Sequence, residues 1–283
     1  MITKDNLLIC IFSYNQDKEL SMLLSSMKEF ASGYDCIVYD DGSTNSNTIS
    51  ILKNSSELFK EQFLLPKEKK TSSRGRLHQN IQSAYEYALE KGYQYLFLVQ
   101  DDMQFVRPLD RSILNEYSTY FDADEKIIQV DPRFLRRLGS IKINNELHAY
   151  SFEDDDDRGS YADVGILDIK KLNNLNWKFE ASERKNKVKA HNIGLKRIFP
   201  FTPIFMHLPY PVIYRKGKKK NKFPYPFVKR GHISYKPLSK KEIKEMDGRD
   251  LSIVPYARDI LTPKGLNLAF LHYKYANEGK IFS

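Results

Sequence analysis

The order of apolar and polar residues predicts alternating strands and helices over the first part of the chain. Apolar runs of strand length are each followed by turn residues or by apolar residues spaced three or four apart, as on one face of a helix. Helical segments begin at Asp17, after the turn residues 41–47 and at Arg76, and Gly92 ends the last one. The expected strands are residues 7–12, 35–40, 62–66 and 93–99.

Strands separated by helices indicate right-handed βαβ units, and so an α/β fold whose mostly parallel sheet is covered by helices on both faces. Beyond residue 105 the pattern is less regular. Residues 161–167 predict a return strand with a close backbone approach at Gly165, and 181–196 predict a polar helix. Residues 197–209 predict a strand pair or an extended edge.

Polar residues follow three of the expected strands. They are residues 13–15 (Ser-Tyr-Asn), 40–43 (Asp-Asp-Gly-Ser) and the adjacent pair Asp101 and Asp102. Since ligands gather at the carboxyl ends of strands in such sheets, these residues should meet at one edge and form a binding site. Nothing resembles a G-x-G-x-x-G turn or a Walker loop, so the standard dinucleotide and NTPase sites lose support.

Charge is unevenly placed in this chain of 283 residues. Residues 211–283 hold 17 Lys and Arg against 6 Asp and Glu, whereas residues 1–210 hold 28 against 30. The excess is densest in 214–227, "YRKGKKKNKFPYPF". A basic segment with interleaved aromatics suits nucleic acid, an anionic membrane surface or an acidic substrate, and equally a solvated loop.

The two cysteines and the hydropathy profile indicate the cellular compartment of the protein. Cys10 and Cys36 both lie in apolar runs, which favours reduced core residues over a disulfide. The first apolar run is too short for a signal peptide, and no run reaches the roughly 18 apolar residues of a membrane span. We therefore expect a cytoplasmic protein.

Four segments resemble nucleotide-sugar glycosyltransferases of the GT-A fold, especially family 2. "ICIFSYNQDKELSMLLSSM" resembles the opening strand and Tyr-Asn turn, and "CIVYDDGSTNSN" the second strand. "SRGRLHQNIQSAYEYALEKGYQYLFLVQDDM" is similar to the helix and strand that lead to an Asp-x-Asp-type motif. "ASERKNKVKAHNIGLKRIFPFTPIFMHLP" is similar to the segment with a family Glu-Asp pair, a helix and a later His.

The resemblance covers roughly residues 6–208 and implies a Rossmann-like GT-A domain at 1–209. Residues 1–105 would bind the nucleotide sugar, and 106–209 the acceptor. Residues 210–283 would form a basic, aromatic-rich C-terminal extension. The chain departs from the family pattern at Gln100, the first Asp-x-Asp position, at Phe12, and at the acidic pair, which is Ser182-Glu183.

By the resemblance, Asp102, helped by Asp101, would hold Mn²⁺ or Mg²⁺ against the donor diphosphate. Such cations prefer oxygen ligands and neutralise the leaving group. His207 would be a further metal or phosphate ligand. The alternatives are turn capping or a salt bridge to Arg107 for the Asp pair, and a buried, satisfied imidazole for His207.

The donor-binding residues implied are Ser13, Tyr14, Asn15, Asp41, Arg74, Asn80 and Asp101. Asp41 would accept a hydrogen bond from the uracil imide, with Tyr14 near the base. Arg74 would contact the diphosphate at the start of the third helix, where the helix N-terminus also favours anions. Turn capping by Asp41 and a surface position for Arg74 are the alternatives.

Inversion at the anomeric carbon needs a carboxylate that deprotonates the acceptor hydroxyl. Glu183 is the candidate, with Asp163 and Glu180 as rivals and an ion pair with Arg184 as its structural alternative.

The resemblance implies a metal-dependent, inverting transferase that moves a sugar from a nucleotide donor, UDP favoured, to a glycan or lipid-linked glycan in cell-surface polysaccharide synthesis. Residues 214–230 would attach it peripherally to the inner face of the membrane. The alternatives are a sugar-1-phosphate nucleotidyltransferase and a nucleic-acid-binding protein, although no nucleic acid partner is expected.

Overall fold

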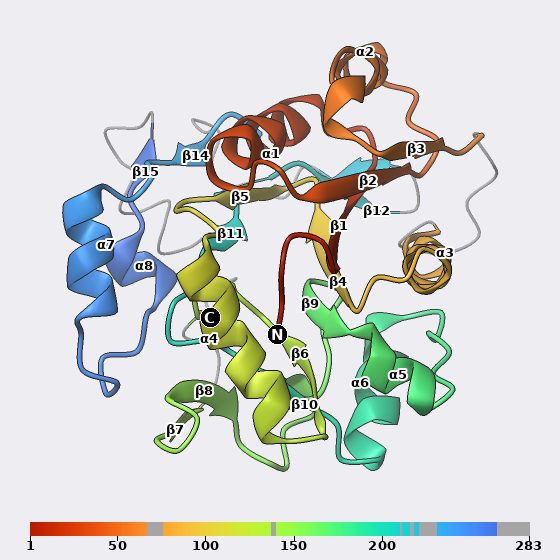
Figure 1. Ribbon diagram of the computed structural model, residues 1–283. Coiled ribbons are helices and arrows are strands. Elements are labelled where there is room, and N and C mark those ends of the chain that lie inside the picture. Colours follow the sequence, from red (N-terminus) through yellow and green to blue (C-terminus); the bar gives the residue numbers. More distant parts are fainter. Residues whose placement is uncertain (67–75, 137–139, 210, 216–217, 221–230, 265–283) are drawn as a thin grey trace.

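The computed structural model describes residues 1–66, 76–136, 140–209, 211–215, 218–220 and 231–264 (Figure 1). Its centre is a seven-stranded sheet in the order β10-β6-β9-β4-β1-β2-β3. All neighbouring pairs are parallel except those that β9 makes with β4 and β6, which are antiparallel. The strands are β1 (Leu7–Ser13), β2 (Asp35–Asp40), β3 (Glu61–Leu64), β4 (Tyr95–Gln100), β6 (Ile127–Val130), β9 (Gly165–Asp168) and β10 (Lys196–Ile198).

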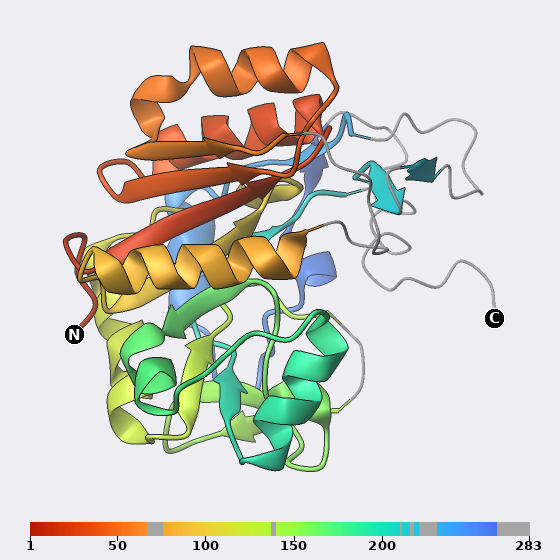
Figure 2. The same cartoon turned by 90° about the vertical axis from the view of Figure 1, so that its right-hand side faces the viewer.

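Helices cover both faces of this sheet (Figure 2). Alternate residues of β1 point to opposite faces, so Leu7, Ile9 and Ile11 join one buried cluster and Leu8 and Cys10 the other. The first cluster contains residues of α1, α2 and α4, and the second residues of α3, α5 and α6. The helices are α1 (Asp17–Phe30), α2 (Ser46–Asn54), α3 (Leu77–Glu90), α4 (Arg111–Ala123), α5 (Ile169–Asn174) and α6 (Glu183–Asn192).

These elements confirm the predicted α/β fold class. β2 has the predicted bounds, and the other three early strands match within a few residues. The return strand is β9, where Gly165 has φ +110° and an added Cβ would lie 2.7 Å from the Val130 carbonyl oxygen. That distance is too short for any side chain, as the predicted close approach requires. Cys10 and Cys36 are buried free thiols, as expected.

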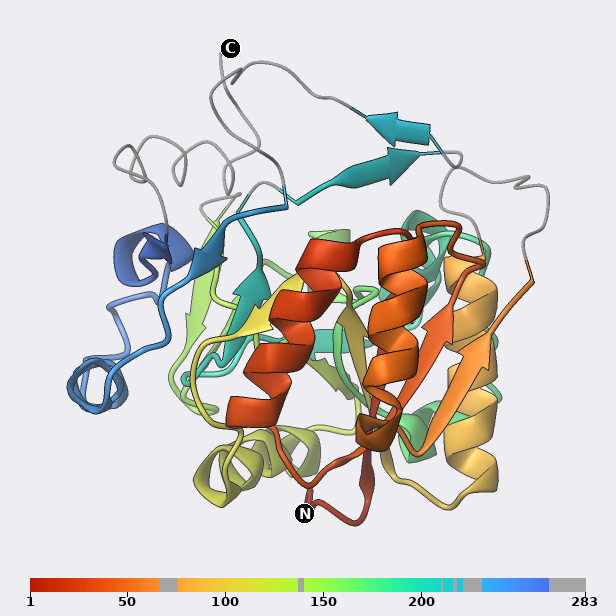
Figure 3. The same ribbon diagram turned by 90° about the horizontal axis from the view of Figure 1, so that it is seen from above.

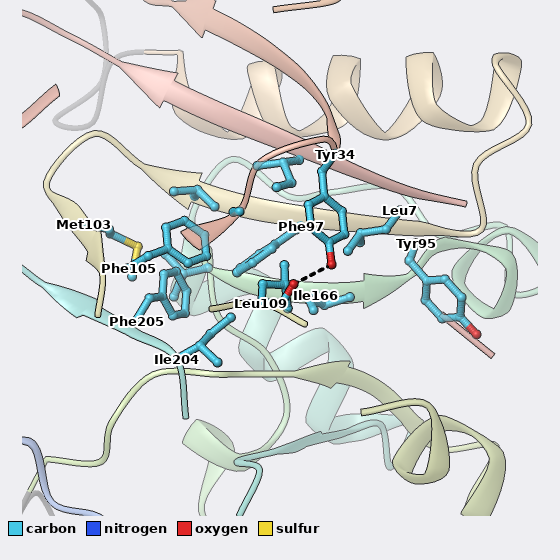
Figure 4. Close-up of a cluster of buried hydrophobic side chains, with 14 of the residues drawn as sticks. Leu7, Tyr34, Tyr95, Phe97, Met103, Phe105, Leu109, Ile166, Ile204 and Phe205 are labelled. Atoms are coloured by element: carbon cyan, nitrogen blue, oxygen red, sulfur yellow. Dashed lines mark hydrogen bonds between the residues drawn. The ribbon is translucent and has the colours of Figure 1, made fainter. Parts of the chain in front are cut away.

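A pair of short strands carries the chain from the sheet towards the site. β5 (Met103–Phe105) pairs antiparallel with β11 (Phe205–His207), so that His207 lies opposite Met103. Phe97 of β4 contacts both Phe105 and Phe205, at ring-centroid distances of 5.9 and 5.1 Å (Figure 4). Burying each such ring stabilises the fold by about 1.5–3 kcal/mol, so this aromatic cluster fixes β5 and β11 against the sheet.

The remaining elements are short. A two-stranded sheet of β7 (Ile141–Asn144) and β8 (Ala149–Phe152) precedes the 3₁₀ turn η2 (Asp157–Gly159), and η1 (Ser56–Leu58) follows α2. The described C-terminal part packs on Val106, Phe134 and Met206 through an apolar cluster of its own. It contains β14 (Ser234–Tyr235), α7 (Lys240–Asp247), α8 (Ala257–Ile260) and β15 (Pro263–Lys264).

The hairpin of β12 (Ile213–Arg215) and β13 (Lys218–Lys220) lies beyond the carboxyl ends of β1 and β2 (Figures 2 and 3). Residues 216–217 and 221–230, which carry most of the predicted membrane contact, lie outside the described residues. Within the described part of the chain, no helix is long and apolar enough to span a bilayer.

Candidate active site

The three polar strand ends meet at one edge of the sheet, as the sequence predicts. The amide of Tyr14 donates to Asp101 Oδ2 at 2.7 Å, and the amide of Asp41 donates to the Ser13 carbonyl at 2.9 Å. The amide of Asp101 donates to the Phe12 carbonyl at 3.1 Å. The ends of β1, β2 and β4 are therefore tied to one another by backbone donors.

Asn15 holds the loops after β1 and β2 together. Its backbone is left-handed, with φ 56°, a conformation that Asn adopts more readily than most residues. Its Oδ1 accepts from the amides of Thr44 and Asn45 at 2.7 and 2.9 Å, and its own amide donates to Ser43 Oγ. Asn15 therefore shapes this edge of the site through the backbone of residues 43–45.

Asp41 forms an ion pair with Arg76, the residue that precedes α3. Arg76 Nε donates to Asp41 Oδ1 at 2.8 Å, and the Arg76 amide donates to Oδ2 at 3.2 Å. Arg74, the predicted diphosphate contact, lies outside the described residues. Asn80 is buried on α3. Arg76 is not among the site residues predicted from the sequence, although its place at the start of the same helix was an available signal.

The adjacent carboxylates after β4 have opposite electrostatic environments. Burial raises the pKa of Asp101 well above its usual value, and the charge of Asp102 adds to this, while the Tyr14 amide opposes it. Burial would also raise the pKa of Asp102, but His207 and Arg136 outweigh it and the pKa lies below its usual value. The surroundings thus favour the ionised form of Asp102 more than that of Asp101. Arg107 forms its salt bridge with Asp247 instead, at 2.6 Å.

His207 lies between Asp102 and Arg133. Its Nδ1 is 3.2 Å from Asp102 Oδ1, and its Nε2 is 3.0 Å from Arg133 Nη1. Because a guanidinium can only donate, Nε2 accepts and Nδ1 carries the proton of the neutral ring. Burial lowers the pKa of His207, with Arg136 and Arg133 acting in the same direction against Asp102. The neutral, Nδ1-protonated imidazole therefore dominates.

Asp102 fits a divalent cation better than His207 does. The described residues contain no group of three or more His, Cys, Asp or Glu that could hold a metal by themselves. A Mg²⁺ or Mn²⁺ ion that serves a diphosphate needs only one or two carboxylates, because phosphate oxygens and water complete its shell. Asp102 is ionised and 19% of its side chain is exposed. His207 would have to release Arg133 to offer Nε2.

Glu183 is the first residue of α6, and Ser182 caps that helix by accepting from the Lys185 amide. The Glu183 carboxylate pairs with Lys187 at 3.0 Å, and 26% of its side chain is exposed. Of the two rivals, Asp163 is buried 3.1 Å from His78 Nε2. Glu180 pairs loosely with Lys189, at 3.7 Å. Glu183 lines a pocket at the start of α6.

That pocket, which we call the basic pocket, has a volume of about 190 Å³. It adjoins the Asp102–His207 pair, because Arg133 lines it and also contacts His207. The lining is rich in cations and aromatic rings, none of which the sequence analysis identified. Its residues are Arg133, Phe134, Leu135, Arg136, Phe152, Arg158, Glu183, Lys187, Arg197, Phe199 and Met206.

Comparisons with solved structures identify the fold. S. aureus TarS 1–349 in complex with UDP matches with a TM-score of 0.50 and 14% identity, over 71% of this chain and 59% of that one. A second TarS structure gives 0.46 and 13%, over 71% and 36%. The mannosyltransferase PcManGT from Pyrobaculum calidifontis, in complex with GDP-Man and Mn²⁺, gives 0.42 and 13%, over 69% and 54%.

The chain thus spans less than two thirds of the length of these proteins. No protein-family model and no curated protein sequence matches it. At this identity the likeness to TarS shows the fold, which is GT-A, and the predicted fold is confirmed.

Proposed function

We propose that the protein is a glycosyltransferase that transfers a sugar from a nucleotide diphosphate donor to a hydroxyl of a glycan or lipid-linked glycan. The observation that carries the proposal is the ionised Asp102 beside His207 at the carboxyl end of β4, in a GT-A fold. Support comes from TarS, which has this fold and whose structure contains UDP.

The loops after β1 and β2 would bind the nucleoside. Asp41 accepts hydrogen bonds from the side chain and the amide of Arg76, and a carboxylate has about four acceptor positions. In the bound state it would accept from the imide N–H of uracil, which favours UDP. Tyr14, held by the bond from its amide to Asp101, would lie near the base.

Asp102 would hold Mn²⁺ or Mg²⁺, which supplies charge neutralisation for the departing diphosphate. Asp101 positions the Tyr14 loop by accepting from its backbone. Arg133 and the neutral imidazole of His207 form the wall next to Asp102, where they would orient the phosphates.

Glu183 would act as the general base of an inverting transfer. It lines the basic pocket, so an acceptor bound there would place its hydroxyl within reach of the carboxylate. The hydroxyl proton would pass to Glu183 as the oxygen attacks the anomeric carbon from the side opposite the diphosphate.

A panel of UDP-, dTDP- and GDP-sugars with Mn²⁺ tests the proposal by slow donor hydrolysis, scored as nucleoside diphosphate release. We expect one UDP-sugar to be hydrolysed above background and the activity to disappear in Asp102→Asn. A matched panel of nucleoside triphosphates with sugar 1-phosphates tests the nucleotidyltransferase alternative. Pyrophosphate release there, without donor hydrolysis, would overturn the proposal.

A further inference from the structure

The basic pocket contains more positive charge than its own carboxylates balance. Arg133 and Arg197 share one carboxylate, Asp131, whose Oδ2 lies 2.5 and 2.9 Å from their guanidinium nitrogens. Arg158 is paired with Asp156, and Lys187 with Glu183. These salt bridges join four of the five cations of the lining to three carboxylates.

Arg136 is the cation left over. Among the described residues, no carboxylate lies within salt-bridge distance of its guanidinium. Burial lowers its pKa, and the neighbouring charge of Arg133 adds to the effect. The charges of Tyr235, Asp102 and Asp131 only partly oppose this lowering. A partly buried guanidinium beside another cation is costly unless an anion pairs with it. The described part of the chain therefore leaves the pocket short of negative charge.

The pocket is built from the half of the chain that the proposed function assigns to the acceptor. Its residues come from the segment after β6, from β8, from η2, from the start of α6 and from the end of β10 to β11. None belongs to residues 13–15, 40–43 or 101–102, where the nucleoside and diphosphate would bind. The lining is therefore built apart from those residues, and Arg133 connects it to His207 beside Asp102.

We infer that the acceptor carries an anionic group, a carboxylate or a phosphate, that binds Arg136 in the basic pocket next to the hydroxyl that Glu183 deprotonates. The inference rests on the proposed function. About 190 Å³ holds roughly six waters at ~30 Å³ each, which is room for such a group and part of its sugar. Phe152 and Phe199 supply apolar surface for the sugar ring.

Protein-observed NMR titrations at saturating UDP test the inference, because bound UDP blocks the donor diphosphate site. The probes are methyl β-D-glucuronide, glucose 6-phosphate and the neutral methyl β-D-glucoside. We expect at least one ionised probe to bind tenfold or more tightly than the neutral one. The probe that binds more tightly identifies the anion as carboxylate or phosphate.

Arg136→Gln should abolish the preference for the ionised probe. Lys185→Gln, which removes a charge from the exposed side of α6 outside the pocket, should change affinity less than twofold. If Arg136→Gln does not fold by its NMR spectrum, Arg158→Gln replaces it and should weaken the same preference.

Equal binding of all three probes would overturn the inference. So would ionised probes that bind only without UDP, since the cations would then serve the donor diphosphate. Failure of the proposed function is seen separately, as the absence of UDP binding in the first titration.

Discussion

The edge of the sheet where β1, β2 and β4 end, which we call the strand-end edge, is rich in carboxylates, whereas the basic pocket is rich in cations. At the edge, neutral N–H and O–H donors of Ser43 and Tyr14 bond to Asp40 and Asp101. Asp41 pairs with Arg76, and Asp102 contacts His207. In the pocket, guanidinium groups gather around Asp131 and Glu183. One region has surplus negative charge and the other surplus positive charge.

Each region therefore selects a ligand of complementary charge. A cation and the imide N–H of a base suit the strand-end edge, and an anion suits the basic pocket. Arg133 links the two regions, because it pairs with Asp131 on one side and contacts His207 on the other. Under the proposed function, this asymmetry would let the protein distinguish a diphosphate donor with its metal from an anionic acceptor.

Of the changes at the strand-end edge, removing the charge of Asp102 should lower transfer activity most. Asp102→Asn keeps the shape but withdraws the ionised ligand, so transfer should fall by about 10²–10³-fold or more. EDTA should abolish transfer by the wild type. Both are measured as nucleoside diphosphate release, with Asp122→Asn on the exposed side of α4 as the matched control. Full activity in EDTA would remove the metal from the mechanism.

Glu183→Gln tests the pocket side of the comparison. Loss of a general base should lower kcat for transfer by about 10²–10⁴-fold, while UDP affinity stays unchanged. Glu180→Gln, three residues away and paired with Lys189, is the matched control and should retain kcat. If both variants transfer normally, the base lies elsewhere in the acceptor half.

Asp41→Asn tests whether Asp41 at the strand-end edge binds the base of the nucleoside. Losing a charged hydrogen-bond acceptor costs about 1.5–3 kcal/mol, or roughly 10- to 150-fold in UDP affinity by calorimetry. Arg76→Gln removes the partner of Asp41 but no contact to the base, so its effect should be smaller. Equal losses in the two variants would mean that Asp41 acts only by positioning the loop.

The sequence predicted the strand-end edge because its residues lie at the ends of strands whose apolar runs are unmistakable. β1, β2 and β4 are buried on both faces, so their pattern is continuous and their ends are visible. Asp41 and Asp101 follow parallel strands, so the sequence also predicts that they lie at the same edge of the sheet. What the sequence did not predict is Arg76, which pairs with Asp41 in the described chain. Arg74 lies outside the described residues and stays a prediction.

The basic pocket could not be read in the same way. It is assembled from segments between residues 133 and 206, and β6, whose end supplies Asp131 and Arg133, has only four residues. Neither β6 nor α4 was predicted. Nothing in the sequence distinguishes Arg133 and Arg136 from surface cations. Arg197 and Glu183 lie far from them in the sequence, and only the tertiary fold places all four in one pocket.

Substitution of Glu19 should have the smallest effect of these changes. Glu19 is a carboxylate near the strand-end edge whose hydrogen-bond donor comes from the chain itself. It is 1% exposed, its Oε1 accepts from the Val212 amide at 2.6 Å, and a Cβ on Gly231 would lie 2.5 Å from it. Glu19 therefore contacts the chain just before and just after residues 213–230. Burial raises its pKa, with the Val212 amide opposing and Asp102 contributing.

A raised pKa means that the folded state binds the proton more tightly than the unfolded state does. The charge of Glu19 therefore destabilises the fold above the folded-state pKa, and this penalty fades as the pH falls towards the unfolded value of about 4.3. Glu19→Gln keeps an oxygen acceptor for Val212 and removes the charge. It should raise the free energy of unfolding by on the order of 1 kcal/mol at pH 7.5, and the gain should shrink at pH 4.5.

Glu19→Ala, which also removes the acceptor, should destabilise at both pH values. Urea unfolding of the three proteins measures these differences, and a Gln variant less stable than wild type at pH 7.5 would show that the carboxylate is held by a cation.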